Sequence, residues 1–140
     1  MPVVIREMHC QDYPAAYALW KSLPGMGLSS ADERKAIRSF LQKNPQTCFV
    51  AEHAGTLIGS ILGGSDGRRG YIYHLAVDHR FQRQGVGRQL VQTCLDALKA
   101  QGIEKCHLFV ISSNQSGRDF WKRLGWQQRD DIIVMSKNMP

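Results

Sequence analysis

The chain has 140 residues, of which 43% are hydrophobic and 21% charged, and its formal net charge is +6 at pH 7. This length and apolar fraction predict one globular domain and exclude a largely disordered chain. No apolar run approaches the roughly 20 residues that span a bilayer, and the N-terminus lacks the apolar core of a signal peptide. We therefore expect a cytoplasmic protein with no membrane-spanning segment.

The basic balance is compatible with nucleic acid, with an acidic partner or with a polyanionic cofactor. Part of the positive charge gathers in the arginine-rich stretch 68–88, and the rest is scattered along the expected helices. A basic face interleaved with aromatic residues is missing, so nucleic-acid binding ranks last. The cysteines show neither paired nor metal-type spacing, which predicts reduced thiols and no metal site; they are Cys10, Cys48, Cys94 and Cys106.

The N-terminal part of the chain predicts a short strand followed by two helices. Residues 3–5 are β-branched and form the strand, and Asp12 can cap the first helix. Ser30 and Glu33 have the spacing of a capping box for the second helix. That helix should end at Asn44, because a proline follows.

The middle of the chain predicts a sheet. Residues 47–52 and 56–63 form strands, and the His-Ala-Gly sequence at 53–55 predicts a hairpin between them. Residues 71–77 form the third strand of an antiparallel meander. A helix then crosses over to a strand at residues 105–111, which should run parallel to the 71–77 strand.

The C-terminal part predicts a short helix and a hairpin. Polar residues at 112–116 cap a helix that carries Phe120 and Trp121, and residues 126–129 and 132–136 form the two strands of a final hairpin. The expected fold is α+β, with a mixed, mostly antiparallel twisted sheet of about six to seven strands and about four helices.

A turn with two glycines connects the 71–77 strand to the crossover helix. Gly85 and Gly87 stand where that helix begins. The first amides of a helix have no partner inside it and lie at the positive end of its dipole, so they can hold a phosphate where no Cβ atom intervenes. A tight connection with exposed arginines is the alternative. The segment has neither the Lys-Ser/Thr pair of a P-loop nor the third glycine of a dinucleotide fold.

Three motifs follow one another along the chain. The central strand ends in Leu75-Ala76-Val77, and the turn reads Gln82-Arg83-Gln84-Gly85-Val86-Gly87. A later helix follows Asn114 and ends in Phe120-Trp121-Lys122-Arg123-Leu124-Gly125-Trp126. This arrangement resembles the GNAT superfamily of acyl-CoA-dependent N-acetyltransferases, closely over residues 71–126 and loosely in the flanks. The resemblance implies one GNAT domain over residues 1–140, in which two central parallel strands splay to admit CoA.

The same resemblance implies that acetyl-CoA is the cosubstrate and that the turn amides hold its pyrophosphate. It implies that Leu75 and Val77 offer backbone groups to the pantetheine arm. Asn114 could equally cap a helix, and Phe120 and Trp121 could equally be core residues. The implied cofactor-binding residues are Leu75, Ala76, Val77, Gln82, Arg83, Gln84, Gly85, Val86, Gly87, Arg88, Asn114, Phe120 and Trp121.

The resemblance also implies that the loop between the first two helices walls the acceptor pocket. Met26, Gly27 and Leu28 are then candidate pocket residues. An ordinary apolar connection between two helices remains the alternative for this loop.

The family's acid and base do not carry over to this chain. Positions at which many relatives hold a Glu have Tyr71 and Phe109, and the usual Tyr position has Trp121. His74 is a candidate base, since the ordinary pKa of histidine is about 6.5, and Tyr71 and Tyr73 can relay protons. Alternation along the strand puts both tyrosines on one face and His74 on the other, unless a bulge intervenes. A hydrogen-bonded sheet residue is the alternative role for His74, and transfer without a strong base is also open.

The sequence thus predicts an N-acetyltransferase that moves an acetyl group from acetyl-CoA to a primary amine of a small molecule or protein, by direct attack in a ternary complex. The alternative is an acyl-CoA-binding GNAT-fold domain with little or no turnover, because the usual Glu and Tyr are missing. The expected partners are acetyl-CoA and an amine acceptor, without membrane or metal, and the protein should be a monomer or homodimer.

Overall fold

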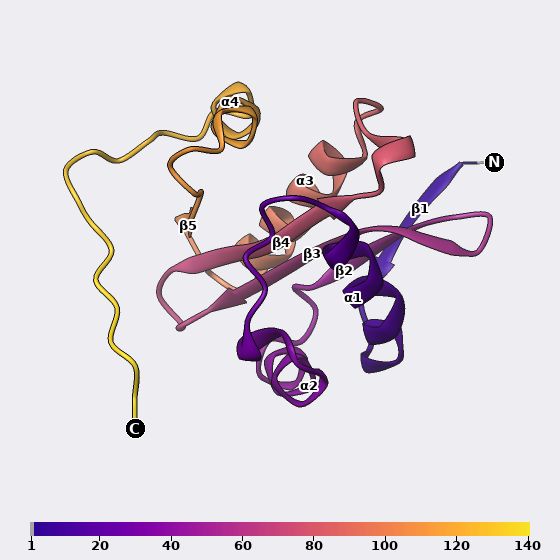
Figure 1. Ribbon diagram of the computed structural model, residues 1–140, viewed down its shortest axis with the longest axis horizontal. Helices are drawn as coiled ribbons and strands as arrows, with labels where there is room; N and C mark the ends of the chain where they lie inside the picture. Colours follow the sequence, from indigo (N-terminus) through magenta and orange to yellow (C-terminus); the bar gives the residue numbers. More distant parts are fainter. Residues whose placement is uncertain (1) are drawn as a thin grey trace. The chain divides into compact units, whose positions relative to one another are not determined.

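The computed structural model describes residues 2–140, which divide into two compact units, the residues up to Phe109 and Val110–Pro140. The first unit holds a five-stranded sheet in the order β1-β2-β3-β4-β5 (Figure 1). The pairs β1–β2, β2–β3 and β3–β4 are antiparallel, and β5 is parallel to β4. The strands are β1 (Val3–Glu7), β2 (Phe49–His53), β3 (Thr56–Ser65), β4 (Gly70–Val77) and β5 (Cys106–Leu108).

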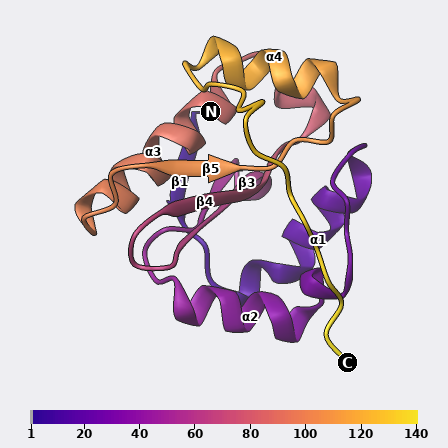
Figure 2. The same ribbon diagram turned by 90° about the vertical axis from the view of Figure 1, so that its left-hand side faces the viewer.

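Helices cover both faces of this sheet. In the first unit, α1 (Tyr13–Ser22) and α2 (Arg34–Lys43) lie on one face and α3 (Val86–Ala100) lies on the other (Figure 2). The second unit contains α4 (Gln115–Arg123). Three short 3₁₀ turns complete the first unit: η1 (Cys10–Asp12), η2 (Ser30–Asp32) and η3 (His79–Phe81). None of the helices described within residues 2–140 has the length and apolarity to cross a bilayer.

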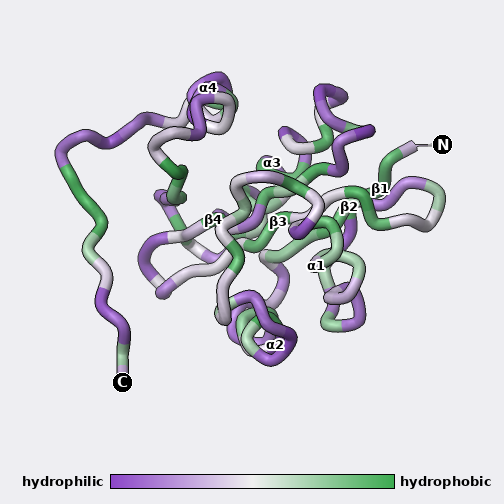
Figure 3. Tube along the Cα trace, in the orientation of Figure 1, coloured by the Kyte–Doolittle hydropathy of each residue, from purple (hydrophilic) through white to green (hydrophobic). Residues whose placement is uncertain are grey.

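The central strand β3 shows why the helices divide between two faces. Its side chains alternate in direction, so neighbours in sequence meet different helices. Ser60 accepts a hydrogen bond from the indole of Trp20 in α1 (2.8 Å), whereas Gly63 faces the thiol of Cys94 in α3. Hydrophobic residues run along β3, and the connection between β4 and α3 is hydrophilic (Figure 3). The core on the α1 side consists of Met8, Ala16, Leu19, Trp20, Ile37, Cys48, Val50, Leu62 and Ala76.

The structure confirms the expected architecture and corrects the strand count. The antiparallel meander, the hairpin at residues 53–55 and the parallel crossover are all present. The sheet has five strands rather than six or seven. The last of them is also shorter than expected, because the ladder between β4 and β5 stops at the pair Ile72 and Leu108.

The predicted final hairpin is wrong. The residues from Trp126 onward form neither helix nor strand, and Ile133 and Met135 are 83% and 86% exposed. Their alternating pattern fits a strand, but a two-stranded hairpin without a third strand or a packed face is marginal. The second unit offers no sheet that could receive it.

The predicted helix caps are displaced by short 3₁₀ turns. Ser29 and Asp32, rather than Ser30 and Glu33, form the capping box, which closes η2 ahead of α2. Asp12 similarly accepts a hydrogen bond from the His9 amide (2.8 Å) and closes η1 instead of capping α1 directly. The end of α2 at Asn44 is confirmed.

The four cysteines are free thiols, and they differ in how far they are buried. Cys48 and Cys94 are buried. Burial raises the pKa of the Cys48 thiol to about 11, and burial likewise raises the pKa of Cys94. Cys106 is partly buried, and Cys10 is exposed. Thiol-directed reagents should therefore reach Cys10 first in the folded protein, since the thiolate is the reactive form.

Gly63 is a position of close approach between α3 and the sheet. A Cβ atom there would lie 2.4 Å from the Cys94 sulfur and 2.6 Å from the Thr47 carbonyl oxygen, both of which are buried. We expect Gly63→Ala to lower the free energy of unfolding by about 3 kcal/mol, the upper end of overpacking costs. Thr56→Ala, at the exposed start of the same strand, should change it by less than about 0.5 kcal/mol. Equal denaturant midpoints for the two variants would contradict this packing.

Candidate functional site

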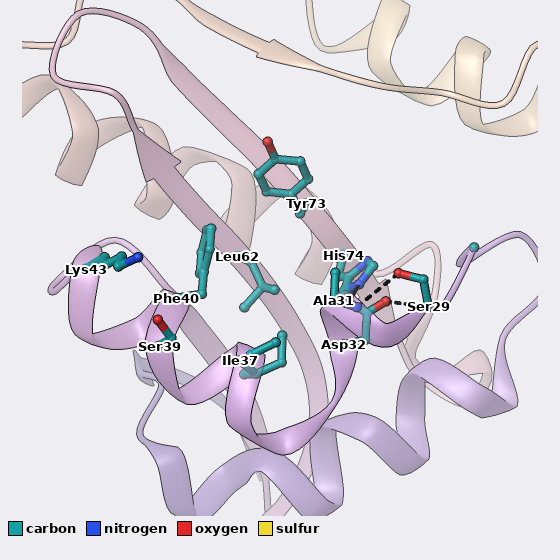
Figure 4. A pocket seen from close by; sticks show the side chains of 12 residues that line it. Ser29, Ala31, Asp32, Ile37, Ser39, Phe40, Lys43, Leu62, Tyr73 and His74 are labelled. Atoms are coloured by element: carbon teal, nitrogen blue, oxygen red, sulfur yellow. Dashed lines mark hydrogen bonds and ion pairs between the residues drawn. The ribbon is translucent and has the colours of Figure 1, made fainter. Parts of the chain in front are cut away.

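A cavity of about 570 Å³ lies between the η2–α2 segment and the strands β3 and β4. Figure 4 shows its walls, with side chains of η2 and α2 on one side and of β3 and β4 on the other. Most of the wall is apolar, and a few polar groups point into it, which is the usual make-up of a small-molecule site. The lining residues include Gly27, Ser29, Asp32, Ile37, Phe40, Lys43, Leu62, Tyr73 and His74.

A β-bulge in β4 brings two consecutive side chains to this cavity. Ser60 of β3 pairs with Ala76 and Leu62 pairs with Tyr73, so both His74 and Leu75 stand opposite a single residue of β3. His74 has a φ of +47°, in the left-handed region that non-glycine residues seldom occupy. The expected alternation therefore fails at this point, and Tyr73 and His74 both line the cavity.

Two contacts hold the imidazole of His74, and a third holds its backbone. Its Nε2 lies 2.5 Å from Oδ1 of Asp32, and its ring centroid lies 4.7 Å from that of Trp20. Its backbone carbonyl accepts a hydrogen bond from the Ser60 hydroxyl (3.1 Å). His74 is thus a hydrogen-bonded sheet residue, as its alternative role required, and it also lines the cavity.

Asp32 is a site residue that the sequence analysis missed. It is only 6% exposed, and its second oxygen accepts a hydrogen bond from the Ser29 amide (2.9 Å). The available signal was the Ser-x-x-Asp spacing of residues 29–32, which marks a capping box. Nothing in that spacing indicates that the same carboxylate meets a histidine of β4.

The two tyrosine candidates separate. Tyr73 lines the cavity with its ring edge-on to Phe40, at a centroid distance of 6.0 Å, and burial raises the pKa of its phenol. In Figure 4 its hydroxyl points away from the pair formed by Asp32 and His74. Tyr71 does not line this cavity and lies beside His107 of β5, with ring centroids 5.8 Å apart.

The loop between α1 and α2 contributes one of its three candidate pocket residues to this cavity. Gly27 belongs to the lining. Met26 and Leu28 instead pack against the core on the α1 side. Gly27 therefore fits a pocket residue, whereas Met26 and Leu28 fit an ordinary apolar connection between two helices.

The far end of β4 has an open edge. Within residues 2–140, pairing with β5 is confined to residues 70–72, so the rest of β4 has no paired strand on that side. Asp78 donates its amide hydrogen to the Ile58 carbonyl (2.7 Å), and in an antiparallel ladder the neighbouring residue, Val77, then directs its backbone groups away from β3. The Val77 carbonyl accepts from the Gln82 side chain (3.0 Å), and its N–H faces the open edge.

The turn after β4 presents unpaired amides at the start of α3. Gly85 is the N-cap with a φ of +84°, and a Cβ atom there would meet nothing within 4 Å. The Gln89 amide is the first to bond back, to the Gly85 carbonyl (3.0 Å). Among the described residues, the amides of 85–88 therefore have no acceptor. Arg83 also has a positive φ, of 63°, while Arg80 is hydrogen-bonded to Asp78 (3.2 Å).

The remaining sequence candidates lie in the second unit. Asn114 caps α4 by accepting a hydrogen bond from the Gly117 amide (3.0 Å), as its alternative role required. Phe120 and Trp121 are in edge contact, with centroids 5.1 Å apart, and Trp121 also contacts Trp126. No cluster of His, Cys, Asp or Glu arranged to hold a metal occurs within residues 2–140.

Comparison with known proteins places this geometry in a family. The model of the acetyltransferase (GNAT) family matches residues 6–126. The chain belongs to the GNAT family. An acetyltransferase of Pectobacterium atrosepticum is 30% identical over 130 residues, with 93% of this chain and 92% of the relative covered. An acetyltransferase of Sodalis glossinidius is 28% identical over 135 residues, with 96% and 94% covered.

Solved structures agree on the GNAT fold. The PaiA N-acetyltransferase of Thermoplasma acidophilum, determined in complex with coenzyme A, superposes with a TM-score of 0.81. The alignment covers 94% of each chain at 18% sequence identity, so this likeness concerns the fold alone. The mixed sheet with four helices is therefore the GNAT architecture, with fewer strands than the sequence suggested.

Proposed function

We propose that this protein is an acetyl-CoA-dependent N-acetyltransferase acting on a primary amine of a small molecule or protein. The observation that carries the proposal is that one strand, β4, contributes to both halves of such a site. His74 of β4 faces the cavity, while Val77 ends the strand at an open edge that leads into the unpaired amides of residues 85–88.

The residues around the turn fit coenzyme A. Unpaired amides at a helix start favour a diphosphate, and the open space at Gly85 leaves room for it. Arg83 and Arg88 add charge, whereas Arg80 is engaged by Asp78. The proposed cofactor-binding residues of the first unit are Leu75, Ala76, Val77, Gln82, Arg83, Gln84, Gly85, Val86, Gly87 and Arg88, and those of the second unit are Asn114, Phe120 and Trp121. When bound, acetyl-CoA supplies an activated acetyl group, to whose carbonyl carbon the amine nitrogen bonds as the carbon–sulfur bond breaks.

Each reacting group has a candidate partner in the chain. We assign the Val77 N–H as the donor that stabilises negative charge on the acetyl oxygen. His74 is the base that takes a proton from the incoming ammonium, directly or through water. The departing CoA thiolate takes a proton from solvent or from the phenol of Tyr73, which is protonated at neutral pH and whose pKa burial raises further. Tyr71, beside His107, is outside the cavity and remains a secondary candidate for proton relay.

We further propose that residues 1–140 act as one domain in the cytoplasm. The family match runs from residue 6 to residue 126 and so crosses the boundary after Phe109. The free thiols at all four cysteines fit a reducing compartment.

The decisive experiment tests acetyl transfer from acetyl-CoA to a panel of amines, with the release of free CoA thiol as the measured signal. The panel should contain short alkyl amines, aminoglycosides and peptides with free N-termini or lysines. Cys10 is exposed and would itself react with a thiol-detecting reagent, so the assay is best run with the Cys10→Ser variant. Turnover of at least one amine well above hydrolysis is expected. Tight CoA binding without any transfer would favour the non-catalytic CoA-binding alternative.

The turn should control CoA affinity. Gly85→Ala forces a Cβ atom onto a left-handed residue at the head of the unpaired amides. We expect the CoA dissociation constant, measured by calorimetry, to rise about tenfold, which corresponds to about 1.4 kcal/mol. Gly102→Ala is a matched control, since Gly102 has a φ of +90° and an open surrounding at the other end of α3. An equal loss of affinity in both variants would contradict the assignment.

His74 should matter for turnover and not for CoA binding. His74→Asn retains a side chain that tolerates the left-handed backbone but removes the imidazole. We expect kcat/KM to fall by about 100-fold or more, since general-base catalysis contributes factors of this size. The CoA dissociation constant should stay within about twofold. Wild-type kcat/KM at all pH values would exclude His74 as the base.

A further inference from the structure

Asp32 stands out among the groups that the proposed mechanism leaves unused. It is the buried carboxylate within residues 2–140, since the other buried polar residues are Thr47 and Ser60. It lies in η2, far in sequence from β4, yet its side chain contacts His74. Burying a carboxylate is costly unless its oxygens are hydrogen-bonded, so the two hydrogen-bond partners of Asp32 indicate its role.

The two oxygens of Asp32 have different partners. Oδ2 accepts the Ser29 amide hydrogen at 2.9 Å, and Oδ1 meets Nε2 of His74 at 2.5 Å (Figure 4). Because a carboxylate only accepts hydrogen bonds, the contact with His74 requires the imidazole proton to be on Nε2. The other ring nitrogen, Nδ1, has no partner in the described chain and is not closed off from solvent.

The surroundings fix the imidazole in this orientation. Trp20 lies against the ring and also donates its indole N–H to the Ser60 hydroxyl (2.8 Å), which in turn donates to the His74 carbonyl. On the other side, the Asp32 carbonyl accepts a hydrogen bond from the Tyr13 hydroxyl (2.7 Å), which ties η2 to α1. Backbone and ring of His74 are therefore held from β3, α1 and η2 together.

We propose that Asp32 is a positioning residue that keeps the His74 imidazole in the tautomer protonated on Nε2, so that the Nδ1 lone pair is free to accept the proton of the acceptor amine. This inference rests on the proposed function and names the group that makes its base usable. The other ionisable side chains lining the cavity are Tyr73 of β4 and Lys43 of α2. In Figure 4 Lys43 lies at the far end of the cavity from Asp32. Of these ionisable side chains, Asp32 is the one in contact with the His74 ring, and it brings a negative charge to it.

The substitution Asp32→Asn separates charge and tautomer from shape. The Ser29 amide is a donor, so the asparagine must place its oxygen there and its NH₂ group towards His74. That NH₂ donates to Nε2, and the proton of the neutral ring then moves to Nδ1. The ring nitrogen that had no partner, Nδ1, becomes a donor and cannot act as a base, although the packing is nearly unchanged.

The experiment reads the tautomer directly, from ¹⁵N chemical shifts of histidine-labelled, substrate-free protein, with kcat/KM for the best amine measured in parallel. The wild-type His74 ring should carry its neutral-form proton on Nε2. In Asp32→Asn the proton should be on Nδ1, and kcat/KM should fall by about 100-fold or more with little change in CoA affinity. Asp32→Glu, which keeps a carboxylate, should recover part of the loss.

Asp12→Asn is the matched control, because Asp12 closes the equivalent 3₁₀ turn by accepting the His9 amide and lies away from the cavity. It should change neither the His74 tautomer nor kcat/KM by more than about twofold. A wild-type ring protonated on Nδ1, or an unchanged tautomer in folded Asp32→Asn, would overturn the inference. The wild-type spectrum decides even if the variant does not fold. Failure of every amine in the transfer assay would instead count against the proposed function and leave the tautomer result to stand by itself.

Discussion

The bulge in β4 is the constraint on which the rest of the site depends. With one extra residue opposite β3, the backbone of His74 enters the left-handed region, and Tyr73 and His74 face the same cavity. A regular strand would have sent them to opposite faces of the sheet. A left-handed non-glycine residue costs on the order of 1 kcal/mol, and it persists only where its surroundings fix it. Here the Ser60 hydroxyl, the Trp20 ring and the Asp32 carboxylate supply those contacts.

Hydrogen bonds connect the elements that surround the cavity, which is the proposed acceptor site. The cavity wall formed by η2 is hydrogen-bonded both to α1, through Tyr13, and to β4, through the contact between Asp32 and His74. A change in the loop between α1 and α2 would therefore reach the candidate base without passing through the sheet. Under the proposed function, the specificity for the acceptor and the orientation of the base depend on the same few hydrogen bonds.

The cofactor side depends on backbone geometry instead. The amides of residues 85–88 are unpaired because a helix begins there, and the N–H of Val77 is unpaired because β5 leaves β4 after Ile72. These are main-chain groups, so many side-chain sequences can present them. Where the resemblance leads one to expect the usual acid and base, this chain has Tyr71, Phe109 and Trp121, and the base that we propose among the cavity residues is His74.

The sequence by itself determined the elements whose signals are local: the strand 71–77, the glycine turn at residues 82–87, the crossover helix and, through their order, the GNAT family. It failed for the final hairpin, because residues 132–136 have the alternation of a strand but no sheet in their own unit to pair with. Only the tertiary structure decided the bulge at His74 and the contact with Asp32. The bulge depends on the register between β3 and β4. The contact between Asp32 and His74 spans 42 positions of the chain and depends on how a 3₁₀ turn packs on the sheet. Neither feature leaves a periodic pattern in the sequence.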